Sequence, residues 1–303
     1  MIDIPDALIA TQSAYNGAAG RAFVAALPGT AAQFLERWGL RRDGGAWYGV
    51  CALVLPVVRE ADGRPAVLKL QLVDEETAGE PVALRLWGAA SAGAVRLLEH
   101  DPLTGTMLLE RLDAHRPLAA VADAREAVRV VGELLAGLTA VRPAAGSGLR
   151  GLGEAAERMV TAAPDVARAL AEEGERRLVR DCAAAVREVA GEPGDRLLHW
   201  DLHFGNVLAG PGEGAGRWVA IDPKPLVGDP GFELLPALND RFDAGAVRWR
   251  FDLLTEALGL DRARARAWTL GRVLQNACWG VESGERRLVP EHAAVARELL
   301  GRG

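Results

Sequence analysis

Two short apolar runs joined by a polar turn most narrowly limit the folds open to this chain. Residues 48–58 (YGVCALVLPVV) and 65–73 (PAVLKLQLV) are rich in branched side chains, and READGRP between them holds the Asp and Gly of a turn. This pattern predicts a hairpin, and GTMLLERL at 105–112 predicts a further strand. Apolar residues recur at helical spacing over 30–40 and 75–100. We therefore expect a small antiparallel sheet that carries helices.

From about Pro117 onward the pattern changes to long helical segments with little sheet. The expected helices cover 122–141, 165–190 (with Pro164 at its start) and most of 232–303; the expected short strands cover 196–200 and 217–222, and RPAAGSGLRGLG at 142–153 is a glycine-rich connection. The sequence thus predicts an α+β fold of two lobes. We expect a sheet-rich lobe over 1–113 and a larger, mostly helical lobe over 114–303.

Composition excludes several classes of protein. The net charge of -6 argues against nucleic acid as the main ligand, because phosphate contacts need a basic surface, but it suits a cationic small molecule. No apolar run is long enough to span a membrane, and the N-terminus lacks a signal-peptide pattern, so we expect a cytoplasmic protein that makes no membrane contact. The three cysteines are far apart and are interpreted as small buried residues: Cys51, Cys182 and Cys278. We favour a monomer.

Lysine is scarce in this chain. Of its 35 basic residues only Lys69 and Lys224 are lysine, so the surface positive charge is almost all arginine. Where a lysine remains, a compact ammonium group is expected to have a role that a planar guanidinium cannot take. Lys69 lies in the strand-like segment VLKL and is a candidate for binding phosphate. Glu80 is the first candidate for the carboxylate that orients it, and Glu76 is the second.

The segment LLHWDLHFGNVLAG at 197–210 concentrates polar side chains between apolar runs. Asp201 and Asn206 stand in the D-x-x-x-x-N spacing of a kinase catalytic loop, in which the Asp accepts a hydroxyl proton and the Asn binds magnesium. Asp222 follows a strand-like run, and a hairpin over 206–222 would bring its carboxylate and Asn206 to one ion. Oxygen ligands of this kind suit magnesium. The set predicts phosphoryl transfer.

The same segment also contains H-x-D-x-H, formed by His199, Asp201 and His203, which is an alternative metal site of a binuclear hydrolase. Such a site needs further ligands downstream, and the remaining histidines, His100, His115 and His292, lie in no motif. His199 and His203 are therefore better interpreted as residues that brace the loop by hydrogen bonds.

Taken together, VLKL, ALRLWGAASAGAVRLLEHD, MLLERL, LLHWDLHFGNVLAG and WVAIDPKPLVGDPGFELLPAL resemble the aminoglycoside phosphotransferase superfamily, and within it the aminoglycoside and hydroxyurea antibiotic resistance kinases. The resemblance spans residues 35 to about 240. It implies a protein-kinase-like fold, ATP and Mg²⁺ as cosubstrates, and transfer of the γ-phosphate to a hydroxyl of a small molecule. Streptomycin or a related aminoglycoside is the first expected acceptor. Hydroxyurea, a sugar or an amino alcohol is the alternative, and a binding protein without catalysis is a further one.

The resemblance also implies roles for single residues. Asp201 corresponds to the catalytic base, Asn206 and Asp222 to the metal ligands, and Lys69 to the phosphate-binding lysine. Three residues correspond to the hinge whose backbone meets adenine: Glu110, Arg111 and Leu112. Residues matched as supporting or substrate-contacting groups are His203, Lys224, Asp229 and Asp240.

The sequence departs from the wider superfamily in the catalytic loop and in the loop expected to cover the nucleotide. Trp200 stands where many antibiotic kinases carry glycine, and the segment DGGAWYGV lacks the G-x-G-x-x-G of protein kinases. Acidic residues of the second lobe are candidates for receiving a cationic acceptor: Glu233, Asp240, Asp243 and Glu282. Three tryptophans are expected to pack between helices or to line the acceptor pocket: Trp249, Trp268 and Trp279.

Overall fold

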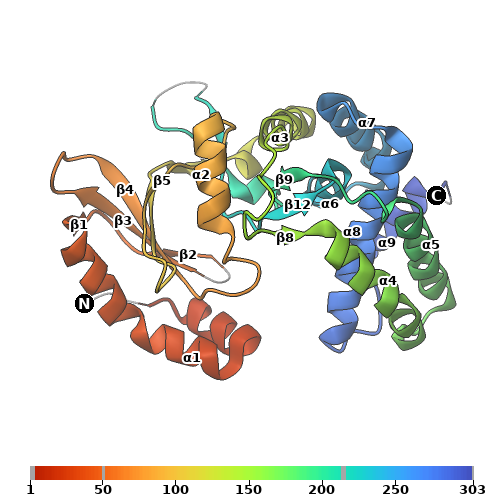
Figure 1. The fold of residues 1–303 in the computed structure, drawn as a ribbon, viewed down its shortest axis with the longest axis horizontal. Coiled ribbons are helices and arrows are strands. Elements are labelled where there is room, and N and C mark those ends of the chain that lie inside the picture. The colour runs from red at the N-terminus through yellow and green to blue at the C-terminus, as the bar shows by residue number, and fades with distance from the viewer. Residues whose placement is uncertain (1–3, 50–51, 213–215, 302–303) are drawn as a thin grey trace.

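The computed structural model describes residues 4–49, 52–212 and 216–301 of the 303-residue chain. A sheet-based half and a mostly helical half lie side by side along the long axis of the molecule (Figure 1). The first half contains β1 (Leu40–Arg42), β2 (Trp47–Tyr48), β3 (Ala52–Arg59), β4 (Pro65–Gln71), β5 (Leu97–His100) and β6 (Met107–Glu110). These strands form one sheet in the order β1-β3-β4-β6-β5, with β2 paired to β3.

The predicted hairpin is confirmed as β3 and β4, which pair antiparallel with Val54 opposite Lys69. Side chains alternate along β4. Leu68 and Leu70 belong to a core under the long helix α1 (Asp6–Arg37), which contributes Phe34 to it. Lys69 therefore faces the other side of the sheet, toward α2 (Glu80–Ala90) and the second half.

The second half contains most of the helices and two three-stranded sheets, ordered β11-β10-β7 and β8-β12-β9. The helices are α3 (Ala124–Leu138), α4 (Leu152–Ala169), α5 (Glu173–Val189), α6 (Leu234–Asn239), α7 (Val247–Leu258), α8 (Arg262–Glu282) and α9 (Pro290–Leu299), with 3-10 turns η1 (Leu118–Ala120), η2 (Phe204–Asn206), η3 (Pro230–Glu233) and η4 (Ala244–Ala246). The strands are β7 (Asp113–Pro117), β8 (Arg150–Gly151), β9 (Arg196–Leu198), β10 (Val207–Ala209), β11 (Trp218–Ala220) and β12 (Leu226–Gly228). No helix in the described ranges has the length and apolar composition that a bilayer crossing requires.

Two segments differ from the sequence prediction. Of the one or two helices expected over 75–100, with interruptions at Gly88 and Gly93, only α2 forms, because Leu97–His100 forms β5 and pairs antiparallel with β6. Pairing in a sheet overrides the helical preference of the LLEH stretch. The helix expected over 165–190 is also wrong: α4 continues through Pro164 and ends at Ala169, and α5 begins at Glu173.

The remaining predictions have mixed outcomes. The helix expected over 122–141 is confirmed as α3, whose N-cap Asp123 accepts a hydrogen bond from the Arg125 backbone N–H. The connection at 142–153 instead contributes β8 and the start of α4. Cys182 and Cys278 are buried as expected, whereas Cys51 lies outside the described residues.

Candidate active site

The loop between β9 and β10 brings Asp201 and Asn206 together. The Asn206 side-chain amide donates to the Asp201 backbone oxygen over 2.9 Å, and it lies 3.5 Å from the Asp201 carboxylate. The turn η2 begins directly after His203, whose ring accepts from the Gly205 backbone N–H over 3.0 Å. The predicted spacing of Asp and Asn thus closes one compact loop, with both side chains half-buried.

The predicted hairpin after this loop places Asp222 beside Asn206. β10 and β11 pair antiparallel, and the Ile221 backbone N–H donates to the Asn206 backbone oxygen over 2.9 Å. Asp222 itself has φ 56°, in the left-handed region that few residues other than glycine adopt. Aspartate is among the side chains that tolerate this region best, and such strain is often found at functional sites.

Lys69 crosses from the sheet to the second half and contacts two carboxylates. Its ammonium lies 2.7 and 2.8 Å from the two oxygens of Glu80 and 2.7 Å from Asp222. Gln71 donates to Glu80 over 2.7 Å and completes the coordination of that buried carboxylate. Glu80 therefore takes the orienting position expected for it, and Glu76 does not.

The two lysines of the chain meet at the same carboxylate. Lys224 lies 3.4 Å from the second oxygen of Asp222, and its backbone N–H donates to the His199 backbone oxygen over 2.9 Å. The scarcity of lysine in the sequence thus marks two residues that converge on one point. Asp222 lies between them with both oxygens engaged.

Burial and charge act in opposition on these groups. Burial would lower the pKa of Lys69, but the carboxylates of Asp222 and Glu80 outweigh it and raise the pKa. Burial would raise the pKa of Asp222, but Lys69 and Lys224 hold it well below the usual range. Lys69 is therefore charged and Asp222 ionised at neutral pH. Burial raises the pKa of Asp201, although the charges of His203, Arg272 and Lys224 oppose this.

The two histidines brace the loop, as expected. His199 is fully buried; its Nε2 lies 3.0 Å from the Ile221 backbone oxygen, and its Nδ1 accepts from the Asp201 backbone N–H over 3.3 Å. Burial lowers the pKa of His199 to about 3, so the ring is neutral. Both ring nitrogens are occupied by the backbone, and no cluster of three or more His, Cys, Asp or Glu suited to a metal occurs within the described residues. The binuclear hydrolase alternative is therefore wrong.

Beneath the loop lies Glu233, whose carboxylate is fully buried. Both of its oxygens lie 3.0 Å from the Trp200 backbone N–H. Burial raises the pKa of Glu233 to about 7, although the backbone N–H groups of Trp200 and His199 oppose this. The expectation that Glu233 receives a cationic acceptor is wrong, because its carboxylate is closed off and holds the backbone beside Asp201.

Three further acids serve the structure: Asp240 and Asp243, which were expected to contact the acceptor, and Asp229, which was expected as a supporting residue. Asp240 accepts a hydrogen bond from the Phe204 backbone N–H and so fixes the middle of the loop. Asp229 caps η3 through the Gly231 N–H over 2.8 Å and pairs with Arg264 over 2.6 Å. Asp243 caps η4 on the surface. Of the four candidate acids for a cationic acceptor, only Glu282 lines a cavity next to the loop.

A cavity of about 300 Å³ lies between the sheet and the β10–β11 hairpin. Its walls are largely apolar, and its polar residues include Lys69, Asn206 and Asp222. The hinge residues Glu110 and Leu112 also line it. The backbone N–H of Glu110 already donates to Arg96, whereas the Arg111 side chain pairs with Asp43, 2.5 Å away. An apolar slot with charge at one end has the form that a nucleotide needs; we name it the nucleotide cavity.

The side chains beside this cavity provide some of the oxygen ligands of a magnesium ion, and phosphate oxygens would provide others. Asn206 and Asp222 offer oxygen ligands, which a hard cation prefers, and a bound Mg²⁺ commonly takes one or two protein groups with phosphate oxygens. The Asn206 NH₂ is turned toward the Asp201 backbone, which leaves its amide oxygen for other partners. These residues therefore fit a magnesium ion that arrives with a nucleotide.

A second cavity, of about 210 Å³, reaches the loop at Trp200. It is lined by the segment before α2, by β8, and by α4 and α8, and Trp279 is part of its wall. Trp279 therefore lines a pocket, which was one of its two expected roles, whereas Trp268 is fully buried against Phe232.

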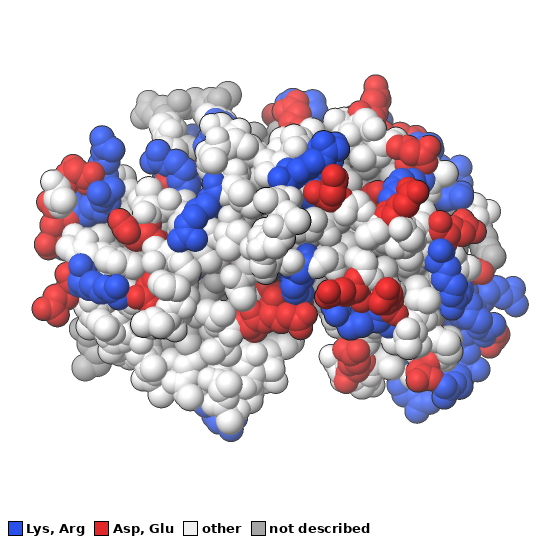
Figure 2. Space-filling model, viewed as in Figure 1, with Lys and Arg blue, Asp and Glu red and all other residues white. Residues whose placement is uncertain are grey.

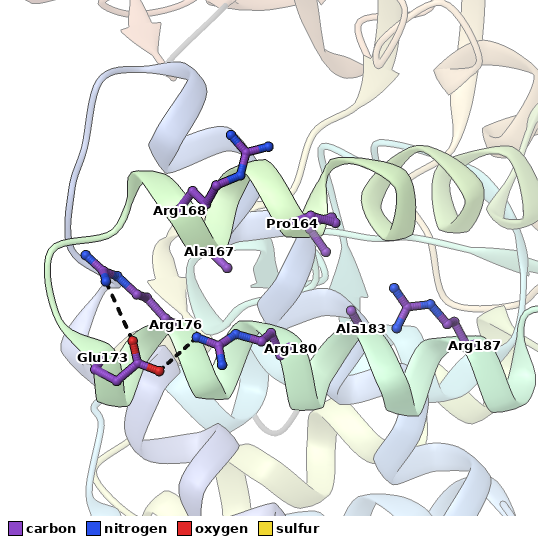
Figure 3. Close-up of a pocket in the computed structure, with 9 residues that line it drawn as sticks. Pro164, Ala167, Arg168, Glu173, Arg176, Arg180, Ala183 and Arg187 are labelled. Carbon is purple, nitrogen blue, oxygen red and sulfur yellow. Dashed lines mark hydrogen bonds and ion pairs between the residues drawn. The ribbon is translucent and has the colours of Figure 1, made fainter.

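A third cleft lies away from the loop, between α4 and α5 (Figure 3). Arginine dominates its wall, and Arg176 and Arg180 share the carboxylate of Glu173. These side chains lie on an open helical surface, and none of them comes from the catalytic loop. The chemistry predicted from the sequence therefore gathers at the first two cavities.

Comparison with known proteins places the chain in a family. Residues 37–284 match the family described as aminoglycoside/hydroxyurea antibiotic resistance kinase. The chain is 64% identical to a hydroxyurea phosphotransferase of Kitasatospora aureofaciens, covering 100% of this chain and 87% of that protein. It is 51% identical to a streptomycin 6-kinase of Streptomyces glaucescens, covering 99% and 98% of the two chains.

Solved structures that resemble this one are small-molecule kinases. The aminoglycoside phosphotransferase APH(4)-Ia, in a ternary complex with AMP-PNP and hygromycin B, gives a TM-score of 0.59 at 14% identity, covering 90% of this chain and 98% of that one. A Plasmodium vivax ethanolamine kinase gives 0.57 at 11% identity, covering 93% and 87%. The predicted two-lobed, kinase-like α+β fold is therefore confirmed. With a family match over most of its length and two relatives above half identity, the chain belongs to the aminoglycoside/hydroxyurea antibiotic resistance kinases.

Proposed function

We propose that this protein is an ATP-dependent phosphotransferase that moves the γ-phosphate to a hydroxyl of a small molecule, with streptomycin as the first candidate. One observation carries the proposal: Lys69, Glu80 and Asp222 meet within 2.8 Å beside the Asp201–Asn206 loop. Phosphoryl transfer depends mainly on positioning and on neutralising charge, and these residues provide both. The streptomycin 6-kinase relative, at 51% identity over nearly the whole chain, supports the acceptor.

In the proposed reaction the acceptor oxygen attacks the γ-phosphorus and Asp201 accepts the hydroxyl proton. The bond to the bridging oxygen breaks, and ADP leaves with that oxygen. Lys69, held by Glu80, would bind phosphate oxygens, and the backbone of Arg111 and Leu112 would meet adenine. Asn206 and Asp222 would hold a Mg²⁺ ion, which would supply further neutralisation of phosphate charge.

The lobes divide this work. We assign most nucleotide contacts to residues 1–113, and catalysis and most acceptor contacts to 114–303. Each cavity also takes residues from the other lobe, such as Asn206 for the nucleotide and Glu75 for the acceptor. The chain turns from one lobe to the other between β6, which pairs with β4, and β7, which pairs with β10. Because ATP and Mg²⁺ are abundant in the cytoplasm, we place the protein there. We also propose that it is a monomer.

Hydroxyurea is the second candidate acceptor, because the relative at 64% identity is a hydroxyurea phosphotransferase. The two candidates differ in charge and size, since streptomycin carries guanidinium groups and hydroxyurea is small and uncharged. A household kinase for a sugar or an amino alcohol would use the same nucleotide side.

The test is transfer from γ-labelled ATP with Mg²⁺ to streptomycin, hydroxyurea, a kanamycin-type aminoglycoside and ethanolamine. We expect transfer to streptomycin, and a loss of about 10³-fold in Asp201→Asn, because a positioned base contributes that much. ATP affinity should stay unchanged in this variant. Full turnover in Asp201→Asn would exclude the proposed base. Bound ATP without transfer to any acceptor would exclude the proposed acceptors.

A further inference from the structure

The cavity of about 210 Å³ meets the catalytic loop at Trp200 and shares no lining residue with the nucleotide cavity. Trp200, directly before Asp201, lines it, whereas Asn206 and Asp222 line the nucleotide cavity. A molecule bound here would approach Asp201 from the side away from ATP. In-line transfer requires such opposed approaches. We name this second space the acceptor cavity.

Unpaired hydrogen-bond donors gather at the inner end of the acceptor cavity. Among the buried side-chain nitrogen atoms of the described residues that have no hydrogen-bond partner, four belong to one stack: Trp200 Nε1, Arg150 Nη2, and Arg272 Nε and Nη1. Trp200 and Arg150 line the cavity, and Arg272 lies behind them. An unpaired buried donor costs about 1–3 kcal/mol, so a cluster of them indicates that a ligand supplies the acceptors.

The stack is held in place from both sides. The guanidinium of Arg150 lies 4.6 Å from the Trp200 ring, and that of Arg272 lies 5.0 Å from it. The ring of Trp279 is 5.7 Å from that of Trp200, and Arg272 also donates to the Trp200 backbone oxygen over 3.3 Å. The indole N–H is therefore fixed in direction rather than free to turn away.

The backbone of Trp200 is strained to place this ring. Its φ is 68°, in the left-handed region, where a non-glycine residue costs about 1–2 kcal/mol. Glycine would adopt this conformation without strain. Tryptophan adopts it at a cost in free energy and places an indole ring at this position. Strain of this kind is retained at sites of function.

The mouth of the acceptor cavity has the opposite chemistry. Glu75 and Glu282 are exposed there, and Glu76 is half-buried between them and the interior. Figure 2 shows acidic side chains on both sides of the notch between the two halves of the molecule. Arg158 lies 3.9 Å from Glu75, at the edge of a salt-bridge distance, so the Glu75 carboxylate is only loosely paired. Carboxylates at a mouth attract cations.

We propose that this cavity recognises a polyhydroxylated ring with cationic substituents: Trp200 Nε1 and Arg150 donate to its oxygens, and Glu75 and Glu282 bind its cationic groups. The inference rests on the proposed phosphotransfer and names the acceptor class and the residues that select it. A guanidino-cyclitol such as that of streptomycin has both features. Hydroxyurea has the oxygen atoms but no charge for the mouth.

The first test compares two tryptophans. Trp200→Phe keeps a ring and removes only the indole N–H, and Trp268→Phe makes the same change at another buried indole whose N–H is unpaired and which does not line the cavity. We expect the KM for streptomycin to rise about 10-fold in Trp200→Phe, with kcat and the KM for ATP within about 2-fold. Trp268→Phe should leave all three unchanged. Equal KM values for streptomycin in Trp200→Phe and wild type would overturn the role of the indole.

The second test uses charge. In Glu75→Gln/Glu282→Gln we expect the KM for streptomycin to rise about 10-fold at low salt and the difference to shrink at high salt, because exposed charges are screened. The KM for hydroxyurea should not change. An equal effect on both compounds, or none on streptomycin, would overturn the assignment of the mouth.

The two levels of the proposal fail differently. If wild type phosphorylates hydroxyurea alone, the inference is overturned while the phosphotransferase function stands. If it binds ATP and transfers phosphate to neither compound, the proposed function itself fails. If it phosphorylates streptomycin and neither variant changes its KM, only the inference fails.

Discussion

The nucleotide cavity and the acceptor cavity meet at one loop but are built in different ways. The nucleotide cavity has apolar walls from strands, among them Val54, Val67 and Leu109, and gathers its charge at one end. The acceptor cavity is lined by charged and aromatic side chains from a loop, a short strand and two helices. An invariant cosubstrate can be bound by a regular sheet and a few fixed groups. A variable acceptor needs side chains that change without disturbing that sheet.

Lys69→Arg should separate the two cavities most clearly. The ammonium fits between Glu80 and Asp222 at 2.7 Å, and the residue is only 5% exposed, so a larger planar guanidinium cannot take the same position. We expect kcat to fall about 10²–10³-fold, the range for loss of one electrostatic group in an active site. The KM for streptomycin should stay within about 2-fold. Steady-state kinetics with both substrates measures these constants.

Lys224→Arg is the matched control for that change. Its ammonium lies 3.4 Å from Asp222 and is partly exposed, so a guanidinium can be accommodated and the loss should be smaller. If Lys69→Arg raised the KM for streptomycin as much as it lowered kcat, the two cavities would not be separate sites, and the comparison would fail.

Glu233→Gln tests the buried carboxyl beneath the catalytic loop, which both cavities reach. The pKa of Glu233 is raised from 4.5 to about 7 in the folded protein, so between these pH values the folded state holds a proton that the unfolded state has lost. Stability from this group is therefore present at low pH and is lost as pH rises from about 4.5 to about 7. We expect wild type, relative to Glu233→Gln, to lose on the order of 3 kcal/mol of unfolding free energy over that range.

Urea unfolding of both proteins at a series of pH values measures this difference. Any hydrogen bond that glutamine fails to make gives a constant offset and leaves the slope unchanged. His199, with its lowered pKa, contributes the opposite slope in both proteins and cancels in the comparison. A difference that is flat from pH 4.5 to 7, or that rises, would show that the Glu233 carboxyl does not titrate in this way.

The nucleotide side was largely predictable from sequence because its groups are close along the chain or follow a strand pattern. Asp201 and Asn206 lie on one short loop, Asn206 and Asp222 flank one hairpin, and Lys69 alternates with apolar residues on a strand. Their spacing alone implies that they meet. The sequence favours Glu80 over Glu76, and the structure gives the reason. Glu80 lies in the first turn of α2 and faces Lys69.

The acceptor side was not predictable, because tertiary contacts decide it. Arg150 lies in a glycine-rich stretch with no strand pattern, and its strand β8 forms by pairing with β12. Arg272 is one of several arginines in α8, and the sequence does not distinguish it from the others. The one local signal was Trp200 at a position where many relatives in the wider superfamily have glycine, which implied a left-handed backbone without showing what the ring contacts. Burial of Met159, Ala163 and Val166 around Pro164 likewise carries α4 through a residue that normally breaks a helix.

The smallest expected effect of a substitution is at the arginine-rich cleft between α4 and α5. We expect this cleft to take no part in binding the nucleotide or the acceptor. Arg180 lies 2.8 Å from Glu173, but both side chains are more than half exposed. Exposed ion pairs contribute little to stability, so Arg180→Gln should leave the unfolding free energy and both KM values unchanged. Thermal unfolding and steady-state kinetics measure this. A several-fold change in either KM would show that this cleft communicates with the catalytic loop, and the acceptor would then be recognised by more of the helical lobe than the acceptor cavity.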